Sequence, residues 1–139
     1  MTAKDVMTKD VVWIEPFSTV REAAGKMEKL NIGALPVCDG QKLVGMVTDR
    51  DIVLHSTAEG KNPDSTTVSQ VMSAKVEYCL EDEGIEAITR KMEDKKIRRL
   101  PVISHNKQLV GIISLADLAV KGGQKAACEV LEKVSQPEK

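Results

Sequence analysis

Two short motifs in this sequence combine a hydroxyl with a carboxylate three residues further on: Thr48-x-x-Asp51 and Ser114-x-x-Asp117. Each motif follows an apolar stretch typical of a strand and opens a stretch typical of a helix. The two side chains then lie one turn apart at a helix N-terminus, where unpaired N–H groups and a partial positive charge suit a phosphate. A carboxylate can also accept hydrogen bonds from two vicinal hydroxyls, as a ribose presents them. The motifs are therefore candidate contacts for ribose and phosphate.

The same spacing has a second explanation that needs no ligand. A Ser or Thr followed three residues later by an acidic residue is a helix capping box, in which both side chains satisfy backbone N–H groups. One residue can also serve both purposes. The motifs alone leave these explanations open.

The two motifs belong to a longer internal repeat. Residues 5–52 recur at residues 70–118, with an offset of 65 that becomes 66 after one extra residue, Gln108. Leu35-Pro36-Val37, for example, matches Leu100-Pro101-Val102. Self-similarity at a fixed spacing indicates two copies of one structural unit. Because each copy has only about 50 residues, we expect the copies to share a core and to enclose two related clefts.

Periodicity and turn signals predict the same elements in both copies. In the first copy we expect a helix with Thr19 as its N-cap and Glu22 completing a capping box, strands over 11–14, 34–38 and 43–48, and a last helix to about Ser56. In the second copy we expect strands over 76–80, 99–103 and 108–114 and helices over 84–95 and 115–121. The predicted organisation is repeat 1 at 1–57, a polar linker at 58–67, repeat 2 at 68–121, and a C-terminal helix (125–134) and tail within 122–139.

The repeated motifs resemble those of the CBS domain, a regulatory module named after cystathionine β-synthase. The resemblance rests on residues 5–8, 33–37 and 45–51 in the first copy and on 71–73, 98–102 and 111–117 in the second. It implies an α/β (α+β) fold of tandem CBS domains, two βαββα-type repeats related by a pseudo-twofold axis. It also implies that adenosine-containing ligands bind in the clefts between the repeats, and that the Ser/Thr-x-x-Asp motif contacts their ribose and phosphate.

Two arginines precede the second Leu-Pro-Val motif. Members of this family often have a basic residue at this position that contacts a phosphate of the ligand. Adjacent strand residues point to opposite faces, so one of Arg98 and Arg99 should point into the cleft, and Arg99 is the better candidate. The matching residues of the first copy, Gly33 and Ala34, carry no charge. The predicted ribose and phosphate contacts are therefore Thr48, Asp51, Ser114, Asp117, Arg98 and Arg99.

An adenine base would need a dry slot. Candidate walls are Val11, Ile32 and Met46 in the first copy, and Val76, Ile97 and Ile112 in the second. Packing in the core explains each of these residues without a ligand.

The composition excludes several classes of function. The formal net charge of −1 argues against a nucleic acid bound through bulk positive charge. No apolar run approaches the roughly 18 residues of a membrane helix, and no signal peptide is evident, so we expect a cytoplasmic protein without a membrane partner. Three cysteines without metal-ligand spacing and two distant histidines predict no metal site. No nucleophile or phosphate-loop motif occurs, so we assign no catalytic residue and expect no enzyme.

These observations together predict a non-catalytic regulatory module. It would bind AMP, ADP, ATP or S-adenosylmethionine and signal occupancy to a separate client protein. We expect a homodimer formed through helix faces that carry Ala23, Met27, Ile88 and Met92. The alternative is a dimerisation or interaction protein whose ligand clefts are empty or vestigial.

Overall fold

The structure is a computed structural model that describes residues 1–122, 128 and 131–135. The chain forms two compact units. Unit 1 combines residues 1–11 with the chain from residue 77 onward, and unit 2 contains residues 12–76. The spatial units thus differ from the sequence copies, because each unit includes a segment that belongs to the other copy.

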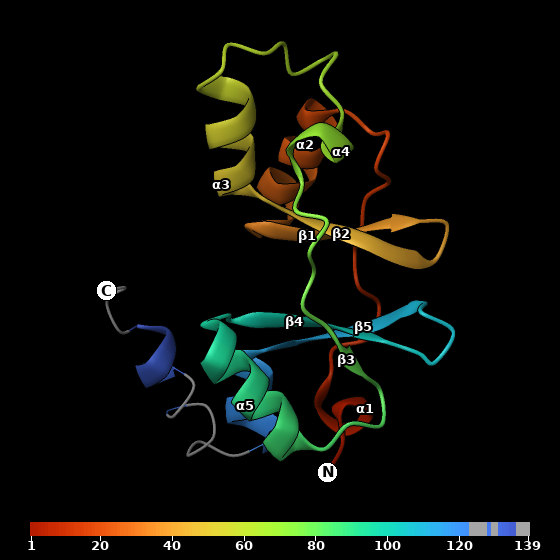
Figure 1. Ribbon diagram of the computed structural model, residues 1–139, viewed down its shortest axis with the longest axis vertical. Helices are drawn as coiled ribbons and strands as arrows, with labels where there is room; N and C mark the ends of the chain where they lie inside the picture. The colour runs from red at the N-terminus through yellow and green to blue at the C-terminus, as the bar shows by residue number, and fades with distance from the viewer. Residues whose placement is uncertain (123–127, 129–130, 136–139) are drawn as a thin grey trace. The chain divides into compact units, whose positions relative to one another are not determined.

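Unit 2 is a two-stranded antiparallel sheet covered on one face by helices (Figure 1). Its elements are α2 (Val20–Leu30), β1 (Ala34–Asp39), β2 (Lys42–Thr48), α3 (Asp49–Ile52), the π-helical turn η1 (Val53–Thr57) and α4 (Val68–Val71). Its core contains Val20, Ala23 and Met27 of α2, Leu35, Val37 and Val47 of the hairpin, and Val68 and Val71 of α4.

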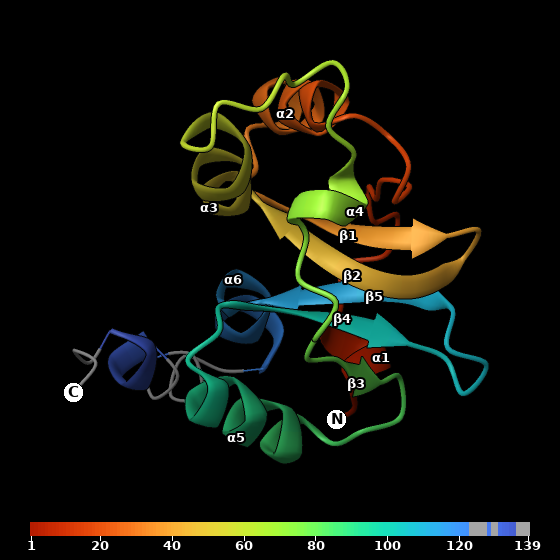
Figure 2. The ribbon, with the colours of Figure 1, turned by 45° about the horizontal axis from the view of Figure 1, so that its top comes forward.

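Unit 1 is a three-stranded sheet with the order β3-β4-β5, again with helices on one face (Figure 2). Strand β3 runs parallel to β4, and β4 runs antiparallel to β5. The elements are α1 (Ala3–Val6), β3 (Cys79–Leu80), α5 (Ile85–Lys95), β4 (Arg99–Ile103), β5 (Leu109–Ser114), α6 (Leu115–Asp117) and the π-helical turn η2 (Leu118–Gly122). The mixed helix and strand fold predicted from the sequence is confirmed.

Local sequence explains the two long helices. The hydroxyl of Thr19 accepts a hydrogen bond from the backbone N–H of Glu22, as the predicted cap requires. Helix α2 ends at Asn31 and α5 ends at Lys96, both with φ of 53°, in the left-handed region that terminates many helices. Both helices direct one apolar face into the core of their own unit.

Two short segments are exchanged between the sequence copies. The N-terminal arm (residues 1–11) belongs to the first copy but packs in unit 1, and the central arm (residues 68–76) belongs to the second copy but packs in unit 2. In unit 1 the backbones of Thr8 and Ile112 exchange hydrogen bonds of 2.8 and 3.0 Å. In unit 2 the backbones of Ser73 and Met46 exchange two of 3.0 Å. The shared core that we expected therefore takes the form of two cores, each built from both copies.

A methionine and a glycine fix each arm. A Cβ atom added at Gly111 would lie 2.5 Å from Sδ of Met7, and one at Gly45 would lie 2.5 Å from Sδ of Met72. Any larger residue at these positions would overlap with the thioether. Glycine is thus what permits each methionine to dock on its strand.

Two predicted strands are largely absent. Of residues 11–14, only Ile14 pairs, by a single parallel bridge with Val37, while Val12 is 39% exposed. Of residues 76–80, only Cys79 and Leu80 form a strand. These segments adjoin the points where the chain passes from one unit to the other, so few of their residues have a neighbouring strand. Of the predicted C-terminal helix, residues 128 and 131–134 are helical, and the rest of 123–139 lies largely outside the described residues.

The helix faces that we expected at a dimer interface are core faces instead. Ala23 and Met27 are buried in the core of unit 2, and Ile88 and Met92 in the core of unit 1. The proposed interface was wrong because the apolar side chains of each helix are buried in the core of its own unit.

Candidate ligand-binding sites

Both Ser/Thr-x-x-Asp motifs form complete capping boxes. In unit 2 the N–H of Asp51 donates to Oγ1 of Thr48 at 3.0 Å, and the N–H of Thr48 donates to Oδ2 of Asp51 at 2.9 Å. In unit 1 the matching distances between Ser114 and Asp117 are 3.2 and 2.9 Å. The capping explanation is therefore correct, but it uses only the Oδ2 atom of each carboxylate. The Oδ1 atom of each aspartate takes no part in the cap.

A hydroxyl from the N-terminal arm reaches the second motif. Oγ1 of Thr8 donates a hydrogen bond of 3.0 Å to Oδ1 of Asp117, and the Ser114 hydroxyl donates one of 3.1 Å to Oδ2. The carboxylate of Asp117 thus lies among hydroxyl and amide donors that come from both sequence copies. The backbone bridge between Thr8 and Ile112 holds this arrangement in place.

In unit 2 the matching hydroxyl belongs to Ser73 of the central arm. Its hydroxyl donates a hydrogen bond of 3.4 Å to the carbonyl oxygen of Lys75. It does not donate to Asp51 in the way that Thr8 donates to Asp117. Sequence reasoning missed both Thr8 and Ser73 as site residues. The signal was present, since the two hydroxyl residues occupy matching positions of the repeat, but only the exchange of arms brings them to the motifs.

Arg99 lies on β4, the strand next to the one that ends in the second motif. It opposes Ser114 in the register of β4 and β5, and its side chain is exposed. The carbonyl oxygen of Arg98 accepts a hydrogen bond from the N–H of Leu115, which fixes the backbone of β4 beside the start of α6. The backbones of the two arginines therefore adjoin Ser114 and Leu115, and their contact with a phosphate stays a prediction.

Unit 2 has no arginine on the strand that pairs with its motif. Ala34 opposes Thr48, and the carbonyl oxygen of Gly33 accepts from the N–H of Asp49 at 2.9 Å. The Asp49 carboxylate lies so close that a Cβ at Gly33 would be 3.0 Å from its Oδ2. The first motif thus contains Asp49 and Arg50, whereas two arginines lie at the start of the strand beside the second motif.

We predict that Arg99→Ala weakens the binding of AMP much more than that of adenosine. A charge-assisted hydrogen bond contributes about 1.5–3 kcal/mol, which corresponds to roughly 10- to 150-fold in affinity, and the lower value applies at an exposed side chain. Titration calorimetry with both ligands measures the difference. Arg90→Ala, on the exposed face of α5, is the control for a general loss of positive charge. An equal loss for AMP and adenosine would exclude a phosphate contact by Arg99.

The six residues expected around the base are all half-buried. Ile32 packs against the core of unit 2 and Ile97 against the core of unit 1, which agrees with a packing role. Met46 and Ile112 are the strand residues that pair with Ser73 and Thr8. Val11 and Val76 each lie at the end of an arm. Their contact with a base stays a prediction.

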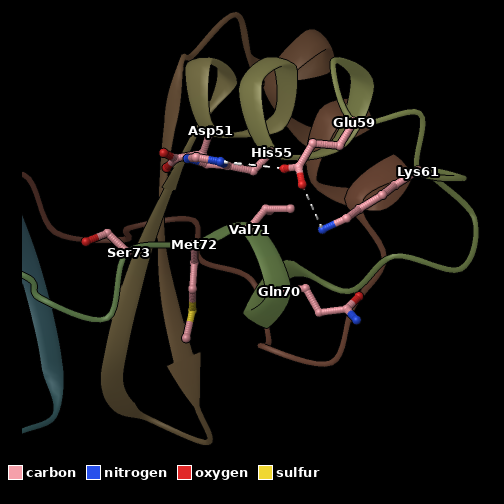
Figure 3. A pocket seen from close by; sticks show the side chains of 8 residues that line it. All are labelled: Asp51, His55, Glu59, Lys61, Gln70, Val71, Met72 and Ser73. Atoms are coloured by element: carbon pink, nitrogen blue, oxygen red, sulfur yellow. Dashed lines mark ion pairs between the residues drawn. The ribbon is translucent and has the colours of Figure 1, made fainter.

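A depression of about 500 Å³ extends from the first motif along η1 to the central arm (Figure 3). Its polar lining was not predicted, because these residues fall at a helix end and in the linker. His55 Nδ1 lies 3.9 Å from Glu59 Oε2, and Lys61 Nζ lies 3.8 Å from Glu59 Oε1. The residues around the depression are Asp51, His55, Glu59, Lys61, Gln70, Val71, Met72 and Ser73.

Cys38 and Cys79 are buried free thiols. Burial raises the pKa of Cys38 to about 11 and that of Cys79 to about 12, so both remain protonated thiols at neutral pH. Among the described residues, no group of three or more His, Cys, Asp or Glu side chains is placed to hold a metal ion. No described helix has the length and apolar character needed to cross a bilayer.

Known proteins share both the sequence and the fold. The YhcV protein of Bacillus subtilis, a CBS domain-containing protein, is 43% identical over 119 residues, which cover 86% of this chain and 84% of YhcV. A crystal structure of Hypoxic Response Protein I with two coordinated zinc ions is 38% identical, with a TM-score of 0.79 over 86% of this chain and 98% of that one. A crystal structure of CBSX2 in complex with AMP is 25% identical, with a TM-score of 0.76 over 87% of this chain and 95% of that one.

The family model for the CBS domain matches twice. The matched segments, residues 3–57 and 68–121, together account for most of the chain and contain both Ser/Thr-x-x-Asp motifs. Each match includes one arm and one capping motif, and the structure combines the arm of one match with the motif of the other. The chain is therefore a member of the CBS-domain family and carries two CBS domains in tandem.

Proposed function

We propose that this protein is a non-catalytic regulator that binds an adenosine-containing ligand of the AMP, ADP or ATP class. The observation that carries the proposal is the Asp117 carboxylate, whose Oδ1 accepts from Thr8 while Arg99 adjoins Ser114 across the strand pair. A ribose can replace the Thr8 hydroxyl as donor to Oδ1, and the guanidinium can receive the phosphate. The AMP complex of the related CBSX2 supports this ligand class.

The exchange of arms supplies a route for signalling. Because Thr8 belongs to the N-terminal arm, a ligand that takes its place on Asp117 changes what holds that arm in unit 1. A separate client protein that contacts the arm would then sense occupancy through the two states of this segment. Asp51 and Ser73 would form the corresponding pair in unit 2.

We also propose a homodimer in a reducing cytoplasm. Leu30 of α2 and Val53 and Leu54 of η1 are 44%, 54% and 43% exposed, and large exposed apolar side chains of this kind suit a subunit contact. The free thiols of Cys38 and Cys79 suit a reducing compartment.

A thermal unfolding panel tests the ligand class. AMP, ADP, ATP, S-adenosylmethionine and NAD should raise the Tm in order of affinity, because a ligand that binds only the folded state adds about 2.7 kcal/mol at 100 times its Kd. Guanosine and cytidine monophosphates keep the ribose and the phosphate, so they are the controls for recognition of the adenine base. Absence of a shift with every adenosine compound at millimolar concentration would favour an interaction protein with empty clefts.

Light scattering on the same samples should give twice the chain mass, and a monomer at micromolar concentration would contradict the dimer.

A further inference from the structure

The two methionines that dock the exchanged arms differ in exposure. Met7 is 6% exposed and belongs to the buried core of unit 1. Met72, at the matching position of the repeat, packs against the core of unit 2 but is only half-buried. Both line a depression, and Figure 3 shows the side chain of Met72 at the edge of the one in unit 2. A small solute can therefore reach Met72 more readily than Met7.

The thioether of Met72 fits a place on β2 that has no side chain. A Cβ atom at Gly45 would lie 2.5 Å from its Sδ and 3.1 Å from its Cε, so the sulfur and the methyl group lie directly on the glycine backbone. The next residue, Ser73, exchanges two backbone hydrogen bonds of 3.0 Å with Met46 of the same strand. The central arm is thus held on β2 by an apolar contact and the backbone pairing beside it.

Oxidation of this thioether is incompatible with the contact. A hydrogen peroxide molecule transfers one oxygen atom to the sulfur, the O–O bond breaks, and the remaining hydroxide takes up the second proton and leaves as water. The sulfoxide is larger and polar. Gly45 leaves no space for the added oxygen, and the core cluster against which Met72 packs consists of apolar side chains that cannot donate to it. The oxygen is solvated only when it turns to the depression, which moves the sulfur away from the glycine.

We propose that Met72 is a peroxide-sensitive modification site, and that its oxidation to the sulfoxide releases the central arm from β2. Ser73 follows directly and lines the same depression as Asp51, so release also changes the surroundings of the first motif. Unit 1 keeps its arm, because Met7 is buried. This reaction requires no adenosine ligand, so it can occur whether or not the function proposed above is correct.

Peptide mass mapping after brief treatment of the full chain with dilute hydrogen peroxide tests whether Met72 is modified. The exposed thiol of Cys128 is first removed by Cys128→Ser. In the folded protein, oxygen should be added to Met72 and to Met1, which is 72% exposed. The core residues Met7, Met27 and Met92 should stay unmodified, whereas all six methionines should react in urea. A folded protein in which Met1 is oxidised and Met72 is not would overturn the site.

Hydrogen exchange on the oxidised protein tests whether the arm is released. The amides of Met46 and Ser73 should lose protection, while those of Thr8 and Ile112, which form the matching pair in unit 1, should keep theirs. Methionine sulfoxide reductase should restore the protection. Full protection of Met46 and Ser73 in a protein that carries Met72 sulfoxide would contradict the release.

Two conservative variants assign the effect to one sulfur. Peroxide should lower the Tm of wild type by about 4–8 °C, the shift that a modest destabilisation of a domain of this size produces. Met72→Leu keeps an apolar side chain of similar volume and should not show this loss. Met46→Leu replaces the half-buried methionine on the strand beside the arm and should show it in full. An equal loss of Tm in both variants would show that Met72 is not the sensitive residue.

Discussion

Replacing Asp117 by Asn should remove the preference of the protein for AMP over 2′-deoxy-AMP in unit 1. Asn keeps the size of the side chain but loses the charge, and its single oxygen cannot serve both the helix cap and the ribose. Loss of a charge-assisted hydrogen bond costs about 1.5–3 kcal/mol, or roughly 10- to 150-fold in affinity. Calorimetric titration of wild type and variant with both nucleotides measures this preference directly.

Asp51→Asn is the matched control. It alters the matching capping box in unit 2, where Asp49 lies within the motif and the paired strand carries no arginine. If unit 1 holds the tighter site, Asp51→Asn should leave the high-affinity step unchanged. A capping role alone predicts another result, since loss of a cap lowers stability by about 0.5–2 kcal/mol without affecting a ligand elsewhere. Unchanged nucleotide affinities in both variants, with only a lower Tm, would leave capping as the whole explanation.

Gly111→Ala should destabilise unit 1 by about 1–3 kcal/mol, the usual cost of overpacking a core. The added Cβ would lie 2.5 Å from Sδ of Met7, 2.8 Å from its Cγ and 3.0 Å from the carbonyl oxygen of Thr8. Met7 is only 6% exposed, so its side chain has little room to move away. Urea unfolding measures the loss, because the added methyl group displaces Met7 and with it the N-terminal arm from β5.

Two further variants separate this contact from the general effect of a methyl group. Gly25→Ala, in α2, meets no atom within 4 Å and should be neutral or stabilising, as Ala in a helix is better than Gly by roughly 0.5–1 kcal/mol. Met7→Ala removes the thioether, so Gly111→Ala should cost less in that background than in wild type. Additive effects of the two substitutions would show that the methionine and the glycine do not form a specific contact.

The sequence was a good guide wherever the signal is local. The N-cap at Thr19, the hairpins that carry Leu35 and Leu100, and the two Ser/Thr-x-x-Asp caps all follow from residues within a few positions of one another. The placement of Arg99 beside Ser114 also follows, because a short hairpin sets its own register. The family was therefore accessible from the sequence alone.

Features that depend on distant pairing were not predictable in the same way. Hydrophobic periodicity shows that α2 and α5 have an apolar face, but not which surface covers it, and so core positions such as Met92 were taken for an interface. The hydroxyl of Thr8 reaches Asp117 only because an arm crosses to the other unit, and nothing near Thr8 in the sequence indicates this. The same exchange explains why residues 11–13 form no strand.

The exchanged arms also constrain how the two copies can diverge. After a duplication, one copy of a repeat is commonly free to lose a function that the other retains. Here the site of the second copy contains Thr8 and Met7 from the first, and the site of the first contains Ser73 and Met72 from the second. Some residues of each site are therefore encoded in the other copy of the repeat. A substitution in one copy of the repeat therefore alters the unit that carries the motif of the other copy.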